Sequence, residues 1–234
     1  MKLRLLFSTT LAMMSVVGAL SLSSGASSNL TPYARMRTAI ADANAERSVR
    51  VTTTAKMSGL KIVQITDAGK NAGRQSITLT KLGYANTVTV VLVAGKLFVK
   101  GDASILTSYL GLSQASANEL GGQWFGIPKS SAYYAQVASG LTITTGMAEV
   151  TMTRSVTSGP TVTLDGVQAN VVKGASVKTP LQPSFQETLY ISTARTPLPL
   201  EVTQRVQGSL GTIVFSDWNE KIHVTAPKIT LHLN

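Results

Sequence analysis

Residues 87–99 read TVTVVLVAGKLFV and carry the pattern that decides the fold. Before Ala94-Gly95, apolar residues recur at every second position, which is the period of a β-strand with one buried face. Ala94-Gly95 is a tight-turn signal, and Leu97-Phe98-Val99 begins a second strand directly after it. The stretch therefore predicts a short antiparallel hairpin, the unit from which a β-meander is built.

The same alternation continues on both sides of this hairpin. Asp67 to Lys70 is predicted to form a turn, and Asp165-Gly166 a tight hairpin. After Phe215, the segment from Trp218 is predicted to turn into a strand at Ile222 and Val224. Further strands are predicted at 49–57, 61–65, 76–80, 148–152, 162–164, 167–171, 189–191, 200–206, 213–215 and 229–233.

Two regions have helical patterns instead. Residues 29–47 repeat apolar positions at three- and four-residue steps, with Thr31 as the N-cap and Pro32 at the first helical position. Residues 102–140 predict three short helices: one after Asp102 as a possible cap, one at 115–120, and one around Tyr133 and Tyr134. A helical segment thus interrupts an otherwise β-rich chain.

The N-terminus has the three parts of a secretory signal peptide. Lys2 and Arg4 form a basic region, residues 5–20 are mostly apolar, and Ser24-Gly25-Ala26 offers small residues for cleavage. We predict residues 1–26 as a cleaved leader and residues 27–234 as one domain. The mature protein is expected to be secreted or to reside in the cell envelope.

The composition excludes several classes of protein. The chain has no cysteine, which excludes disulfides, thiolate metal sites, cysteine nucleophiles and a lipid-anchored lipobox cysteine. Its net charge of +10 falls by 2 to +8 once Lys2 and Arg4 are removed. For an exported chain this surplus favours anionic lipid head groups or acidic polymers over nucleic acid, although scattered charge also serves solubility alone. His223 and His232 alternate with apolar residues and are expected to face solvent. No cofactor, metal site or catalytic residue is predicted, and the protein is expected not to be an enzyme.

Several segments in order resemble one known family. They are Lys96–Asp102, Gly122–Pro128, Leu189–Ile191 with Pro197–Val202, and Gly211–Trp218 followed by Ile222–Pro227. Together these segments resemble the actinobacterial LppX and LprG lipoproteins, relatives of the LolA-like lipoprotein carriers. The resemblance implies a mainly β (α+β) fold: a strongly curved antiparallel half-barrel sheet with short helices over its concave face. The missing lipid-anchored cysteine departs from the family pattern.

The resemblance also implies a cavity between sheet and helices that holds acyl chains of a lipid or lipidated molecule. The residues predicted to line it are Val51, Val90, Leu92, Ile105, Leu106, Tyr109, Leu110, Trp124, Phe125, Tyr133, Tyr134, Ile191 and Phe215. The same side chains are equally suited to fill a core beneath the sheet. We therefore expect a lipid or amphiphile carrier of the cell envelope. The alternative is a partner-binding or stress-sensing module that has this fold and holds no lipid.

Overall fold

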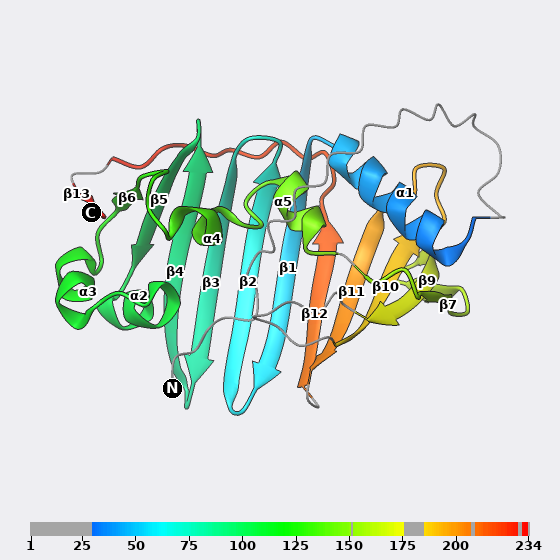
Figure 1. Cartoon of the computed structure of the whole chain (residues 1–234), viewed down its shortest axis with the longest axis horizontal. Coiled ribbons are helices and arrows are strands. Elements are labelled where there is room, and N and C mark those ends of the chain that lie inside the picture. Colours follow the sequence, from blue (N-terminus) through cyan, green and yellow to red (C-terminus); the bar gives the residue numbers. More distant parts are fainter. Residues whose placement is uncertain (1–29, 151, 176–184, 207–208, 229–230, 234) are drawn as a thin grey trace.

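The structure, a computed structural model, describes residues 30–150, 152–175, 185–206, 209–228 and 231–233. The predicted leader and its cleavage site lie outside these residues. No helix in the described part of the chain is long and apolar enough to cross a membrane. The described elements are one large open sheet and five helices, and the helices lie over one face of that sheet (Figure 1).

The sheet contains thirteen described strands, in the order β13-β6-β5-β4-β3-β2-β1-β12-β11-β10-β9-β7, with β8 also paired to β9. Except for the parallel pair of β13 and β6, neighbouring strands are antiparallel. The strands are β1 (Ser48–Met57), β2 (Leu60–Gly69), β3 (Gly73–Lys81), β4 (Tyr84–Val93), β5 (Lys96–Gly101), β6 (Phe125–Ile127), β7 (Thr157–Ser158), β8 (Val162–Leu164), β9 (Val167–Ala175), β10 (Gln186–Ser192), β11 (Pro199–Val206), β12 (Ser209–Ser216) and β13 (Leu231–His232). The predicted fold class, an open antiparallel half-barrel with short helices, is confirmed.

Tight turns connect the predicted meander. The pairs Ser58-Gly59, Leu82-Gly83, Ala94-Gly95 and Asp165-Gly166 all have positive φ at both residues, which is the backbone of the two-residue hairpin turn. The turn predicted at Asp67 to Lys70 begins later, because β2 continues to Gly69 in register with β1.

The first helix begins as its sequence indicates. α1 spans Pro32–Ala45, with Pro32 in the first turn and the Thr31 hydroxyl accepting a hydrogen bond from the Ala34 N–H (3.2 Å). Met36, Ala39 and Ala43 are buried. The predicted helix of 29–47 therefore starts three residues too early and ends two residues too late.

The other helices cross the sheet between β5 and β7. They are α2 (Ala103–Leu110), α3 (Gln114–Leu120), α4 (Tyr134–Ala138) and α5 (Ile143–Ala148). Asp102 occupies the N-cap position of α2, but its side chain makes no capping hydrogen bond.

The strand predicted at 148–152 is wrong for its described part, because α5 continues to Ala148, residues 149–150 form a turn, and Met152 makes only a single bridge. Thr142 and Thr145 make a reciprocal capping box that starts the helix. Ile143 and Met147, four residues apart, are both buried on its inner side.

The closing hairpin predicted after β12 is also wrong. β12 is already paired with β1 on one side and β11 on the other, so no edge is left for a returning strand. Asn219 holds the turn after β12, its N–H donating to the Ser48 carbonyl (2.9 Å) and its Oδ1 accepting from the Arg47 N–H (2.8 Å). The chain then follows the strand ends to the far edge, where β13 pairs with β6 (Figure 1).

Candidate functional site: the covered inner face of the sheet

We call the helix-covered side of the sheet the inner face. The strand register places the predicted lining residues Val51, Val90, Leu92 and Phe215 on it. Val51 lies opposite Phe215, Val90 opposite Val99, and Leu92 opposite Leu97. In an antiparallel pair, directly opposed side chains point to the same side. The inner face is therefore continuous across β5, β4, β3, β2, β1 and β12.

Two apolar clusters cover this face. The α2-side cluster joins β2–β6 to α2, α3 and α4 and includes Val90, Leu106 and Phe125, all buried. The α1-side cluster joins α1 and α5 to β9–β12 and includes Met147, Ile191 and Phe215. Both clusters are built from the protein's own side chains.

The predicted lining residues divide between the clusters. Val90, Leu92, Ile105, Leu106, Leu110 and Phe125 are buried in the α2-side cluster, with Tyr109, Tyr133 and Tyr134 packed against it. Ile191 and Phe215 are buried in the α1-side cluster, with Val51 packed against it. Trp124 is partly buried and belongs to neither cluster. The sequence thus identified inward-facing residues, but the structure separates them into two groups.

A polar band lies on the inner face between the clusters. By register, Thr53 lies opposite Gln64, and Thr66 lies opposite Gln75, at positions that apolar residues occupy elsewhere on the same strands. Thr53, Thr66 and Gln75 are buried, and the Gln75 amide donates to the Thr66 hydroxyl (3.1 Å). Hydrogen bonding of this kind makes a buried polar band tolerable.

The two glutamines of the polar band, Gln64 and Gln75, line the sheet side of a small cavity of about 40 Å³. That volume has room for roughly three water molecules, far less than an acyl chain needs. Tyr109 of α2, Gln136 of α4 and Glu149, which directly follows α5, line it on the helix side. The lining residues are Gln64, Gln75, Ile77, Tyr109, Gln136, Ser139, Gly140 and Glu149.

One carboxyl group faces this cavity. Burial raises the pKa of Glu149, and the hydrogen bond that Glu149 accepts from the Ser139 hydroxyl (2.6 Å) partly opposes that rise. Burial raises the pKa of Tyr109 as well, and the nearby Glu149 carboxylate adds to the effect. The cavity therefore offers amide, hydroxyl and carboxyl groups, and no lysine or arginine lines it.

A second buried carboxyl group lies on the inner face of β10. Glu187 is 3% exposed, and its Oε1 accepts a hydrogen bond from the Gln204 amide (2.9 Å). Its Oε2 has no hydrogen-bond partner among the described residues. Burial raises the pKa of Glu187 to about 7, an effect that the Gln204 hydrogen bond partly opposes.

Sequence reasoning missed Gln64, Gln75, Gln136, Ser139, Glu149 and Glu187. For the strand residues a signal did exist, because Gln75 falls on the same alternation as Ile77 and Leu79, and so replaces an apolar residue on the inner face. For Gln136, Ser139 and Glu149 there was none, since their approach to the sheet depends on how the helices fold back over it.

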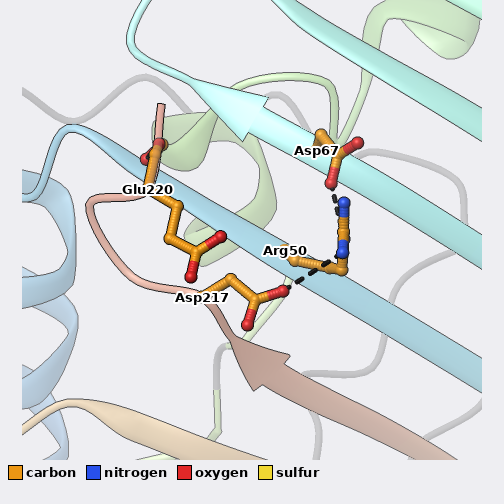
Figure 2. Close-up of polar contacts among 5 residues, drawn as sticks. Arg50, Asp67, Asp217 and Glu220 are labelled. Carbon is orange, nitrogen blue, oxygen red and sulfur yellow. Dashed lines mark hydrogen bonds and ion pairs between the residues drawn. The ribbon is translucent and has the colours of Figure 1, made fainter. Parts of the chain in front are cut away.

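The outer face carries a separate group of charges. Arg50 donates to Asp67 (2.8 Å) and forms an ion pair with Asp217 (3.2 Å), with Glu220 close by (Figure 2). These contacts join β1, β2 and the turn after β12. The three paired side chains are about a third to a half exposed, so we assign them a modest structural role.

An open, curved antiparallel sheet with short helices over its inner face is the fold that the resemblance to the LppX and LprG lipoproteins implied. Among solved structures, the chain is similar to LprF from Mycobacterium bovis, with 13% identity, 84% of this chain and 96% of that chain covered, and a TM-score of 0.54. It is also similar to the lipoprotein LppX from Mycobacterium tuberculosis, with 15% identity, 83% and 98% coverage, and a TM-score of 0.50. No protein-family model and no curated protein sequence matches the chain. The resemblance to the LppX and LprG lipoproteins is thereby confirmed for the fold.

Proposed function

We propose that this protein is an exported carrier that holds the acyl chains of a lipid or lipidated molecule between the inner face of its sheet and the helices above it. The main support is the way in which α2, α4 and α5 cover that face. They are separate short helices that meet the sheet through buried apolar side chains such as Leu106, Val137 and Met147. Apolar contact is non-directional, so an acyl chain can replace it.

Among the described residues, few polar contacts hold the α4–α5 region in place. The Tyr134 hydroxyl donates to the Gly95 carbonyl (2.9 Å), and Gly69 forms an isolated bridge with Thr142. In our proposal the helices move away from the sheet, and the ligand occupies the space that their side chains now fill. Each CH₂ group of the ligand that is buried contributes about 0.8 kcal/mol, and this gain opposes the cost of separating the helices from the sheet.

A carrier must exchange its ligand with a membrane. The net charge of the chain would favour contact with anionic head groups, and this contact is part of the same proposal. We further propose that the protein has no enzymatic activity of its own. A broad hydrolase screen should give no turnover, and reproducible turnover that depends on the protein would contradict this part.

The test first looks for lipid bound to the exported protein and then disrupts the proposed acyl-chain site with charged substitutions on the inner face. Native mass spectrometry and organic extraction should reveal a co-purified lipid. Lipid-free protein should take up a fluorescent fatty acid, and Val90→Asp or Leu106→Asp should abolish uptake because the buried charge has no partner. Ile65→Asp is the matched control, since Ile65 is partly exposed on the outer face.

A second candidate function is favoured by one observation: among the described residues, both clusters consist of apolar side chains of the protein itself that pack against each other. This suits a partner-binding module that holds no lipid. Folded Val90→Asp and Leu106→Asp variants, verified by circular dichroism, that take up the probe like the wild type would favour this second function. So would wild-type protein that neither carries nor takes up lipid.

A further inference from the structure

Two hairpins of the sheet turn at the same side of the molecule. They connect β1 to β2 and β3 to β4, and they lie at the bottom of Figure 1. The end of β11 and the start of β12, which pair with each other, lie at the same side. We call the strand ends at this side the lower rim. Leu82 and Tyr84 at the β3–β4 turn are 86% and 80% exposed, and Leu210 on β12 is 53% exposed. These are the most exposed large apolar side chains in the described part of the chain.

The conformation of Leu82 is unfavourable for its residue type. It occupies the first position of the turn with φ = 51°, in the left-handed region where asparagine, aspartate and glycine are favoured and a bulky side chain is uncommon. The corresponding residues of the other two-residue turns are Ser58, Ala94 and Asp165, which are small or polar. A leucine here is disfavoured by both conformation and solvation, which indicates a role for the exposed side chain itself.

Basic residues surround these apolar side chains. Lys56 lies directly opposite Lys61 in the β1–β2 pair, and Lys81 lies opposite Tyr84 in the β3–β4 pair. On β11, Arg205 lies opposite Leu210. All four basic residues are exposed. Like charges placed directly opposite across two strands repel each other, so the Lys56–Lys61 pair is unfavourable without an external anion.

Acidic groups lie toward the opposite end of the same strands. Asp67 is the only acidic residue between 48 and 93, and it pairs with Arg50 near the other end of β1. Asp217 follows the far end of β12. The lower rim thus combines exposed apolar side chains with basic groups that no neighbouring acidic residue of β1–β4 neutralises.

We propose that the lower rim docks on an anionic membrane surface. Leu82 and Tyr84 enter the interface between head groups and acyl chains, where an aromatic ring with a polar tip is well placed. Lys56, Lys61, Lys81 and Arg205 contact the lipid phosphates. The apolar residues select a membrane over a soluble acidic polymer, because a polymer would use the basic residues and leave Leu82 and Tyr84 in water. Docking at the rim locates the head-group contact that forms part of the carrier proposal, but it requires no lipid inside the protein, so its test is separate from the test of lipid uptake.

The test measures co-sedimentation of lipid-free, exported protein with vesicles. One set contains equimolar phosphatidylcholine and phosphatidylglycerol, and the other phosphatidylcholine alone. We expect clear preference for the anionic vesicles. Each lysine near such a surface strengthens binding roughly fivefold, so the triple variant Lys56→Gln, Lys61→Gln, Lys81→Gln should weaken it by about a hundredfold. The control triple variant Lys96→Gln, Lys129→Gln, Lys221→Gln has the same net charge as the rim triple variant. Its three lysines are also exposed but lie away from the lower rim, so vesicle binding should weaken much less.

The apolar half of the rim has its own pair of variants. The double variant Leu82→Asn, Tyr84→Ser should bind anionic vesicles about tenfold more weakly, because it loses the buried apolar area. It should keep the fold, because asparagine readily adopts the positive φ of this turn position. Ile65→Thr with Val167→Thr removes two partly exposed apolar residues elsewhere and should bind like the wild type. The N-terminus of every protein is verified by mass spectrometry, so that residual leader contributes equally.

Three results would overturn the proposal: no preference for anionic vesicles, a control triple as weak as the rim triple, or a Leu82→Asn, Tyr84→Ser variant that binds like the wild type. In the last case, lysine-dependent binding of a soluble polyanion would assign the rim to an acidic polymer instead.

Discussion

Glu187 provides the sharpest test of the packing on the inner face. Replacing it by glutamine keeps the shape and the contact with Gln204 but removes the ionisable group. In the folded protein the pKa of Glu187 is about 7, against 4.5 for a free side chain. Because each pKa unit corresponds to 1.36 kcal/mol, the ionised carboxylate destabilises the fold by about 3 kcal/mol at high pH.

The sign follows from proton binding. Since the folded state holds the proton more tightly, well below pH 4.5 both states are protonated and the group has no effect on stability. As the pH rises from 4.5 to 7, the unfolded state ionises first and stability is lost. Glu187→Gln should therefore resemble the wild type at low pH and exceed it by about 3 kcal/mol above pH 7. In a domain of this size that raises the Tm by roughly 6–12 °C.

Urea unfolding at several pH values measures the effect directly. The pKa of Glu149 is also raised, but Glu149 is present in both proteins and cancels in the difference. Glu119→Gln makes the same chemical change on the exposed side of α3, away from the inner face, and is the matched control. A Glu187→Gln variant whose advantage is the same at all pH values, or absent above pH 7, would refute the reasoning.

Three further predictions concern other parts of the chain. Gly73→Ala should lower the free energy of unfolding by about 3 kcal/mol in urea denaturation, because the new Cβ would lie 1.9 Å from the Leu141 carbonyl oxygen. Gly146→Ala within α5 is the control. Its Cβ would meet nothing closer than 3.8 Å, so it should be neutral or stabilising in the same assay. Arg50→Gln should lower the free energy of unfolding by less than about 1 kcal/mol, and by less still at high salt. A large loss that does not depend on salt would contradict the minor role of its ion pairs. N-terminal sequencing of protein from the native host should begin at Ser27, and a chain starting at Met1 in the membrane fraction would exclude the cleaved leader.

The sequence by itself determined the local elements. Alternation in residues 87–93 and 97–99 set the strands, Ala94-Gly95 and Asp165-Gly166 set two turns, and Thr31-Pro32 set the start of α1. These features depend on backbone preferences within a few residues, and they can therefore be read without the fold. The same alternation identified which side chains of β1, β4 and β12 point inward.

Only the tertiary structure decided how distant segments meet. The segment after β12 does not return as a hairpin, because both edges of β12 are already paired, with β1 and β11. The sequence of that segment carries no sign that the neighbouring edge is occupied. The polar cavity exists because α2, α4 and α5 fold back over Gln64 and Gln75. The lower rim gathers Lys56, Lys81 and Arg205 through the strand register. Burial, charge proximity and pairing are properties of positions in space, so the environments of Glu149 and Glu187 were decided by packing between segments far apart in the chain.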